Sequence, residues 1–214
     1  MQNRLNEKQQ AIIPIAVYAA IGQMDKLNSA LHRGLNAGLT INEIKEVLVH
    51  IYAYCGFPRS LNAISTLITV LENRNLKGIT DETGRDPAPV PEGWNSLMAG
   101  TENQTRLVGK AVTGNIFEFL PAIDQFLKSH LFGDLFQRDV LDWSTRELVT
   151  ISALAAMPGV TSQLKSHYAI SINSGLTFEQ LYHFVDILES EYGDISINSA
   201  REVLSQFLDA EKNL

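Results

Sequence analysis

Apolar residues recur along most of the chain at the three- and four-residue spacing of amphipathic helices, and few segments show the alternation typical of strands. Polar or glycine-containing stretches separate these periodic segments and give their expected boundaries. We therefore expect an all-α fold of about ten helices. The predicted helices lie at residues 5–21, 24–37, 41–55, 58–74, 103–112, 115–131, 144–156, 160–174, 177–190 and 194–211.

Signals at helix starts support several of these boundaries. A Ser or Thr followed three residues later by Glu or Gln has the spacing of a capping box, in which each side chain bonds the backbone N–H of the other residue. Gly56 and Pro58 mark the opposite event, the end of the helix at 41–55. The capping pairs are Thr40 with Glu43, Ser144 with Glu147, and Thr177 with Gln180.

Residues 77–101 differ from the rest of the chain because glycine and proline interrupt them repeatedly. Such residues end helices, so we expect a linker or an irregular arm here. Trp94 and Leu97 indicate that this arm docks onto the rest of the protein. The interrupting residues are Gly78, Gly84, Pro87, Pro89, Pro91 and Gly93.

The chain also carries an internal repeat. Residues 26–40 (KLNSALHRGLNAGLT) match residues 163–177 (QLKSHYAISINSGLT) at a shift of 137 positions, and both end in Gly-Leu-Thr. We predict two copies of a four-helix unit, at 5–74 and 141–211. The predicted organisation is a first repeat (1–76), a linker or arm (77–101) and a second repeat with its leading helices (102–214).

The stretch EIKEVLVHIYAYCGFP places ionisable side chains beside an apolar stripe. Glu46, His50 and Tyr54 follow one another at one-turn steps along the edge of that stripe. The second repeat lacks these groups but carries Glu147 and His167, where the first repeat has alanines. If the repeats pack around a pseudo-twofold axis, these five side chains form one composite site.

Charge and cysteine content narrow the possible partners. The net charge is −7 without any Lys/Arg cluster, so nucleic acid and anionic membranes are poor partners. The polar start and the short, helix-patterned apolar run after it argue against a signal peptide or a transmembrane span. Cys55 is the only cysteine, which excludes an intramolecular disulfide and favours a cytoplasmic location. No two histidines have close ligand spacing, so we expect no metal site.

Two stretches resemble the carboxymuconolactone decarboxylase family, whose fold is shared with alkyl hydroperoxidase D-like proteins. They are LNAGLTINEIKEVLVHIYAYCGFPRSLNA and FGDLFQRDVLDWSTRELVTISALAAMPGVTSQLKSH…NSGLT, and with the neighbouring helices they cover most of the chain except the linker. The set comprises an Arg-Glu-Leu helix start, a His eight residues before Gly-Leu-Thr, and a Tyr-x-Gly-Phe-Pro ending. The resemblance implies a duplicated alkyl hydroperoxidase D-like helical repeat and a homo-oligomer, a trimer or hexamer.

The hydroperoxidase-like branch of this fold uses a Cys-x-x-Cys-x-x-x-His helix for thiol chemistry, assisted by the Glu of the Arg-Glu-Leu helix. His167 and Glu147 match that His and that Glu. Val160 and Gln163 stand at the two cysteine positions, so the redox disulfide cannot form. This departure argues against a peroxidase of the usual kind.

Similarity to the decarboxylase branch implies a lyase that uses no cofactor and acts on a small carboxylated lactone or related acid. Loss of CO₂ would leave a dienolate-like intermediate, which needs stabilisation of the lactone oxygen and a proton delivered to carbon. The resemblance assigns the acid to His50 or His167, since imidazole transfers protons near neutral pH. Glu46 or Glu147 would orient that imidazole, and Tyr54 would donate a hydrogen bond to the developing oxyanion.

Three further residues are candidates for substrate binding. Arg146 would anchor a carboxylate, with a structural salt bridge as the alternative. Phe57 would shape the pocket wall, and Cys55 would line the pocket or fill the core. Two other functions stay open: a peroxidase or antioxidant-type member that acts through Cys55, and a non-catalytic protein that binds a small ligand.

Overall fold

The computed structural model describes residues 4–192 and 198–211, and all regular structure within these ranges is helical. The all-α prediction is therefore confirmed. The predicted start of the last helix, at residue 194, lies outside the described residues. In chain order the elements are α1 (Glu7–Ile21), α2 (Met24–Asn36), α3 (Ile41–Cys55), α4 (Phe57–Leu76), α5 (Ser96–Val108), α6 (Asn115–Phe119), α7 (Pro121–Phe126), a π-helix η1 (Leu127–Leu135), α8 (Trp143–Ala156), α9 (Thr161–Ser174), α10 (Phe178–Tyr192) and α11 (Asn198–Glu211).

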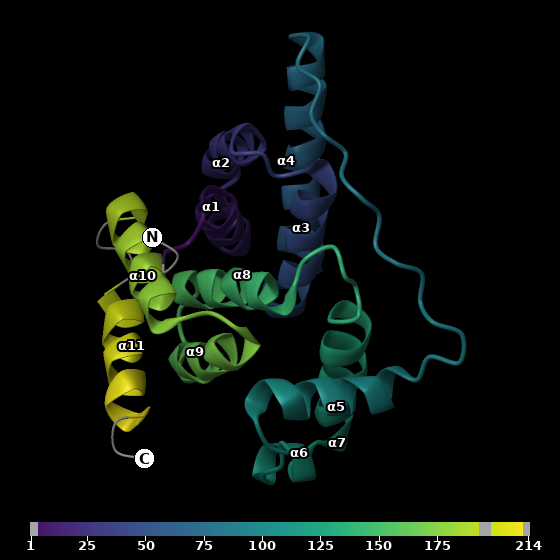
Figure 1. The fold of residues 1–214 in the computed structure, drawn as a ribbon, viewed down its shortest axis with the longest axis vertical. Helices are drawn as coiled ribbons and strands as arrows, with labels where there is room; N and C mark the ends of the chain where they lie inside the picture. The colour runs from purple at the N-terminus through teal and green to yellow at the C-terminus, as the bar shows by residue number, and fades with distance from the viewer. Residues whose placement is uncertain (1–3, 193–197, 212–214) are drawn as a thin grey trace.

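Helices of the two repeats correspond under the shift of 137 residues, because α3 at 41–55 maps onto α10 at 178–192 and α1 maps onto α8. The counterparts α1 and α8 pack against each other at the centre of the molecule (Figure 1). Helix α3 packs on α8, and its counterpart α10 packs on α1. Each repeat thus places its third helix on the first helix of the other, which is the arrangement of a pseudo-twofold axis.

Burial is greatest in the central pair of helices. Residues 12–20 of α1 and 146–155 of α8 are all buried, so neither helix has a solvated face over these stretches. Both helices contribute to the larger of two hydrophobic clusters in the described chain, while η1 contributes to the smaller one. Polar side chains on the buried part of α8 must therefore find partners inside the protein.

Two of the predicted capping boxes are present. Thr40 accepts from the Glu43 N–H at 3.1 Å and Thr177 accepts from the Gln180 N–H at 3.2 Å, each with the reciprocal bond. The box predicted at the start of α8 is wrong. Asp142 caps that helix by accepting from the Thr145 N–H at 2.7 Å, which leaves Glu147 free to turn inward.

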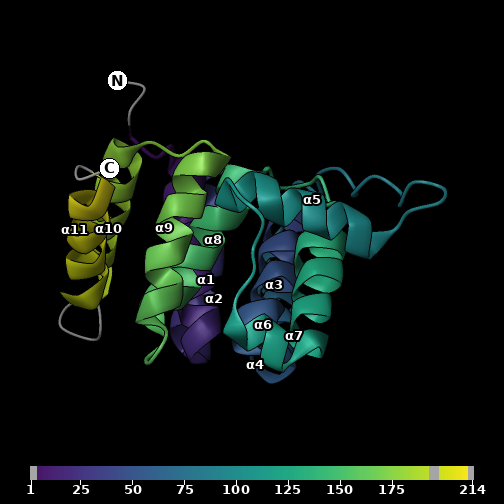
Figure 2. The ribbon, with the colours of Figure 1, turned by 90° about the horizontal axis from the view of Figure 1, so that it is seen from below.

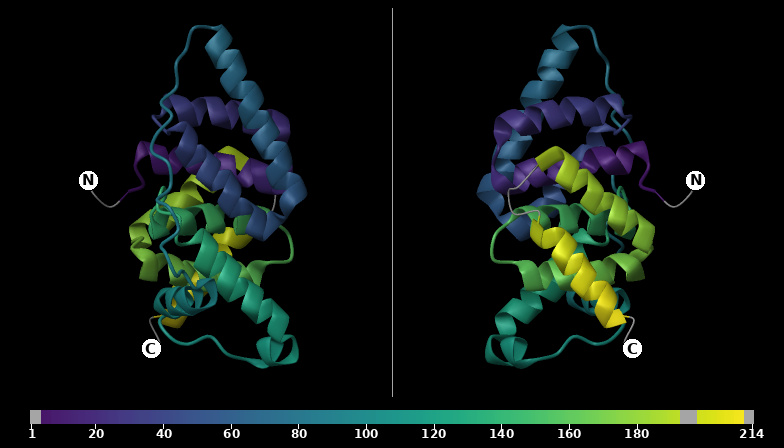
Figure 3. Two further views of the ribbon diagram at one scale, coloured as in Figure 1. Left: turned by 90° about the vertical axis from the view of Figure 1, so that its right-hand side faces the viewer. Right: turned by 90° about the vertical axis from the view of Figure 1, so that its left-hand side faces the viewer.

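The arm that follows α4 runs along the outside of the first repeat until it reaches α5 (Figure 3). Part of its docking is through the backbone, since the N–H groups of Ile41 and Asn42 donate to the carbonyls of residues 82 and 83 at 2.9 Å. Trp94 is half-buried, whereas Leu97 is 42% exposed. The predicted docking therefore occurs, but Leu97 contributes little to it.

The irregular segment ends earlier than predicted, because α5 begins at Ser96 and ends at Val108 instead of spanning 103–112. Asn95 caps this helix by accepting from the Met98 N–H at 2.9 Å. Gly100 lies inside this helix, and its lack of a side chain allows η1 to approach closely. A Cβ atom at Gly100 would lie 1.8 Å from the Lys128 carbonyl oxygen.

The single helix predicted at 115–131 is instead divided into α6, α7 and η1. Pro121 begins α7 and cannot extend α6, because it has no backbone N–H. Together with α5 these elements form one end of the molecule, away from the α10–α11 pair (Figure 2). None of the helices within the described ranges combines the length and hydropathy needed to cross a bilayer.

Candidate functional site

A histidine and a glutamate from neighbouring helices of the second repeat form a close pair. Nδ1 of His167 on α9 lies 2.7 Å from Oε2 of Glu147 on α8. The Glu147 side chain is fully buried, whereas the imidazole keeps 12% of its surface exposed. The carboxylate therefore holds Nδ1–H and fixes the ring orientation. Among the described residues, Nε2 of His167 has no hydrogen-bond partner.

His50 is enclosed on all sides. Its Nε2 lies 2.9 Å from the Thr150 hydroxyl, which itself donates to the Arg146 carbonyl at 3.0 Å. The hydroxyl oxygen must then accept a hydrogen bond from Nε2–H of His50, which leaves the Nδ1 lone pair facing Nη1 of Arg146 at 3.5 Å. Complete burial, the Arg146 charge and His167 hold the pKa of His50 well below its ordinary value. His50 is thus a neutral imidazole with both nitrogens occupied.

Glu46 is shared between two arginines. Nε of Arg138 lies 3.0 and 3.1 Å from its two carboxylate oxygens, and Nη2 of Arg146 lies 3.0 Å from Oε2. Glu46 is 3% exposed and Arg146 is 0% exposed. Burial alone would raise the pKa of Glu46, but the hydrogen bonds and charges of Arg138 and Arg146 outweigh it and lower that pKa.

Tyr54 lies between the two histidines. Its ring centroid is 5.4 Å from that of His50 and 5.8 Å from that of His167. The hydroxyl is buried without a hydrogen-bond partner in the described part of the chain. Burial and the negative charge of Glu147 raise the pKa of Tyr54, so the phenol stays protonated and can act as a donor.

The structure thus brings together the five residues singled out from the sequence, from α3 of the first repeat and α8 and α9 of the second. A polar network runs from Glu46 through Arg146, His50 and Thr150. Tyr54 joins it to the His167–Glu147 pair. Only His167 in this set combines partial exposure with a nitrogen that is free to act on another molecule.

The three candidate substrate-binding residues lie in three different environments. Arg146 is fully buried in its pairing with Glu46, which matches the salt-bridge alternative instead of an anchor for substrate. Phe57 is 63% exposed and stacks on Tyr52 at 4.6 Å, outside the composite cluster. Cys55 packs against the larger hydrophobic cluster, and burial raises the pKa of its thiol to about 11.

Two members of the network were not predicted from the sequence. Thr150 follows Arg146 by one helical turn on the buried face of α8, so helical periodicity could have identified it. Arg138 lies in the loop before α8, where no pattern marks it. It reaches Glu46 only because the fold brings this loop onto α3.

The position equivalent to Glu46 in the second repeat holds His183, and no comparable cluster forms there among the described residues. His183 is 8% exposed, and its Nδ1 accepts from the Leu5 N–H at 3.1 Å. This contact ties the start of the chain to α10. Of the two positions related by the pseudo-twofold axis, Glu46 thus belongs to the polar network and His183 makes a structural contact with the start of the chain.

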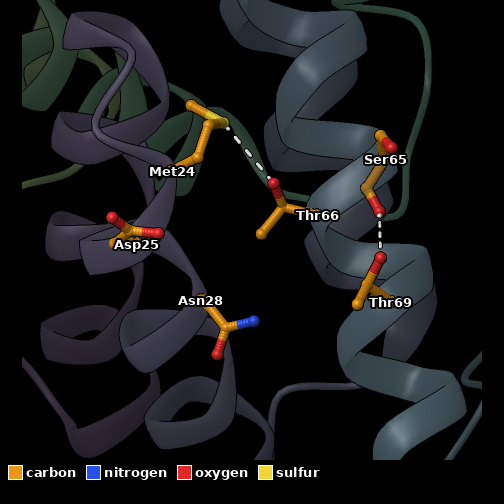
Figure 4. A pocket seen from close by; sticks show the side chains of 6 residues that line it. All are labelled: Met24, Asp25, Asn28, Ser65, Thr66 and Thr69. Carbon is orange, nitrogen blue, oxygen red and sulfur yellow. Dashed lines mark hydrogen bonds between the residues drawn. The ribbon is translucent and has the colours of Figure 1, made fainter.

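A separate pocket of about 370 Å³ lies between α2 and α4 (Figure 4). The Thr66 hydroxyl points to the Met24 sulfur at 3.5 Å across its edge. Asp25 is the only ionisable residue in the lining, so this pocket lacks the pairs of acid and base needed for proton transfer. Among residues 4–192 and 198–211, no three His, Cys, Asp or Glu side chains are placed to hold a metal ion.

Comparison with known proteins adds a family relationship to this geometry. The family model described as the carboxymuconolactone decarboxylase family matches residues 1–67 and 121–206, which include α1–α3 and α8–α10. An uncharacterised protein from Methanocaldococcus jannaschii is 30% identical over 67 residues, or 31% of this chain. The aligned region spans 63% of that relative's length.

Proposed function

Because the chain belongs to the carboxymuconolactone decarboxylase family, we propose that it is a carboxy-lyase that uses no cofactor and acts on a small carboxylated lactone or related acid. The observation that carries this proposal is the His167–Glu147 pair beside the unpartnered hydroxyl of Tyr54. Together these groups supply a proton donor and a hydrogen-bond donor for an oxyanion.

In the proposed reaction, the bond between the carboxylate carbon and the ring breaks and CO₂ leaves. The electron pair of that bond enters the conjugated lactone and forms a dienolate. Protonated His167 then delivers the Nε2 proton to carbon, and solvent restores it. Glu147 stabilises the imidazolium through Nδ1–H, and the Tyr54 hydroxyl donates to the dienolate oxygen.

His50 has a supporting role in this proposal, which differs from the sequence-based alternative that made it the acid. A general acid must carry a proton that it can release to substrate, but His50 is buried, neutral and bonded at both nitrogens. We assign it to positioning Tyr54, whose ring lies against it. Glu46 and Arg146 hold His50 in place in turn.

The proposal is tested by measuring CO₂ release from a set of unsaturated carboxylated lactones. Wild type should release CO₂ from at least one of them, and in D₂O the product should carry deuterium at the dienolate carbon that takes up the proton. His167→Gln should abolish release. His130→Gln changes an exposed histidine outside the cluster and serves as the matched control. Turnover by His167→Gln at the wild-type rate would exclude this mechanism.

Two other functions were left open by the sequence. A thiol peroxidase acting through Cys55 is disfavoured, because the high pKa keeps the thiol protonated at neutral pH and no second cysteine exists. A non-catalytic binding protein would use the same cluster without turnover. Binding of the lactones without release of CO₂ would favour that function.

We also propose a homo-oligomer, with the exposed apolar surface around α6 and α7 as its interface. Monomeric proteins rarely expose apolar patches of this kind. Phe119 is 90% exposed, and a cavity of about 510 Å³ is lined by Phe57 of α4 and Phe126 of α7. The exposed apolar side chains of this surface are Phe57, Leu61, Ile116, Phe119, Leu120, Ile123 and Phe126.

The single, unpaired Cys55 fits a cytoplasmic location.

A further inference from the structure

A cavity of about 410 Å³ lies between α3, α4 and the arm, at the end of the polar network opposite His167. Helix α4 supplies an apolar wall of side chains at helical spacing, Ile64, Leu67, Ile68 and Leu71. The facing side is polar and contains Lys45, Glu46 and Arg138. Asp86 and Pro87 of the arm complete the rim.

The arm is held in place over this cavity by specific bonds. The Asn42 side-chain amide donates to the carbonyls of Gly84 and Arg85 at 3.3 and 3.1 Å, and to Oδ1 of Asp86 at 3.1 Å. Asp139, next to Arg138, accepts from the Ala88 N–H at 2.8 Å. The rim is therefore a fixed part of the cavity.

The cations of this cavity are incompletely satisfied. Arg138 uses Nε and Nη2 on Glu46, and its Nη1 has no hydrogen-bond partner among the described residues. Among the described residues, the Lys45 ammonium donates only to the neutral side-chain oxygen of Asn42, at 3.1 Å. The lining carries two cations, Lys45 and Arg138, and two carboxylates, Glu46 and Asp86. The Glu46 carboxylate is already shared between Arg138 and the buried Arg146.

We propose that this cavity is a binding site for an amphipathic monocarboxylate. The apolar part of such a ligand would cover the α4 wall, and its carboxylate would pair with Lys45 and Nη1 of Arg138. Asp86 opposes the carboxylate from the rim and limits the affinity. The site is separate from the His167–Glu147 pair and does not depend on the proposed reaction, although Glu46 belongs both to its lining and to the network that holds His50.

The test is isothermal titration of the full chain with hexanoate and, as the uncharged match, hexanamide. Hexanoate should bind more tightly than hexanamide. Lys45→Gln should weaken hexanoate binding about threefold to fivefold, the usual effect of one exposed charge, and should leave hexanamide unchanged. Asp86→Asn should strengthen hexanoate binding, because it removes the negative charge on the rim. Lys110→Gln, at an exposed lysine outside the cavity, is the control for charge.

The apolar wall is tested with a second pair of variants. Ile68 is 52% exposed, so Ile68→Glu should fold and should abolish hexanoate binding by repelling the carboxylate. Leu76→Glu adds the same charge to the same helix outside the cavity and should bind as wild type does. His167→Gln should also bind hexanoate normally. Equal binding of hexanoate and hexanamide, no binding of either, or loss of binding in His167→Gln would each overturn the proposal.

Discussion

Nδ1 of His167 lies 2.7 Å from Oε2 of Glu147, and the pair joins two helices of the second repeat at the edge of the molecule's largest hydrophobic cluster. The carboxylate is fully buried while the imidazole reaches the surface. The Glu147 carboxylate can therefore stabilise a positive charge on the imidazole from inside the protein, while Nε2 of His167 contacts a ligand.

Glu147→Gln should reduce the rate of CO₂ release by about 10²–10⁴-fold, because the imidazolium loses its carboxylate partner while the side-chain volume is kept. Steady-state kinetics should place the loss in kcat more than in KM. Circular dichroism and thermal melting serve as controls for folding. A variant that is folded and fully active would show that Glu147 only packs beside the histidine.

Tyr54→Phe should lower kcat by about 10- to 1000-fold, since the variant removes the proposed donor to the dienolate oxygen and keeps the ring. Stability should change little or increase slightly, because a buried hydroxyl without a partner is lost. Chemical denaturation measures the second effect. A folded variant with unchanged kcat would contradict the assignment of Tyr54 to the oxyanion.

Glu46→Gln should destabilise the protein by roughly 3 kcal/mol, because Arg146 would keep a buried charge without its counter-ion. The pKa of Glu46 is lowered by its arginine partners, so this carboxylate stabilises the fold above the pKa of an unfolded Glu, near 4.5. That contribution is lost as the pH falls through the lower, folded pKa. Denaturation at pH 7 and in acid should therefore show the difference between wild type and variant shrinking at low pH.

His50→Gln should flatten the pH dependence of stability below pH 6.5. The pKa of His50 is lowered, so the unfolded chain takes up a proton that the folded protein does not. Wild type should lose roughly 1 kcal/mol more than the variant between pH 7.5 and 5.5. His32 and His183 also have lowered pKa values, but they remain in both proteins and cancel in the comparison. Parallel pH profiles would contradict this account.

Phe126→Glu should shift the protein toward smaller species in light scattering after size-exclusion chromatography, since it places a charge in the proposed interface. Leu76→Glu, at a position 85% exposed on α4 and outside that surface, should keep the wild-type mass. A wild type that is monomeric at high micromolar concentration would remove the proposal.

Sequence periodicity located most of the helices well, because the apolar residues of α2–α4 and α10 recur at helical spacing. It was less accurate where a local signal had more than one physical use. Gly100 lies in the segment predicted to be irregular, yet it is part of α5 and allows a close approach to η1. Ser144 resembled an N-cap, yet its hydroxyl donates to Asp142, which caps the helix instead.

The residues of the composite site could be found from the sequence because they were lost in a complementary way between the repeats. Their contacts could not be found, because these depend on how α3 packs across α8. Arg138 illustrates this limit, since a loop residue without periodicity supplies the second cation on Glu46. The sequence offered His50 and His167 as equivalent acids. The structure distinguishes them by burial, because His50 is fully buried and His167 is partly exposed.

The Glu46–Arg146 pair has a consequence for the history of the chain. One member comes from each half of the duplicated sequence, and both are withdrawn from water in the joined protein. A half made alone would present a lone carboxylate or a lone guanidinium on the face where its sister should sit. Two identical halves could not restore the match, since Gln10 stands in the first half at the position of Arg146 and His183 stands in the second half at the position of Glu46. Separating the two halves again would therefore leave both charges without a partner.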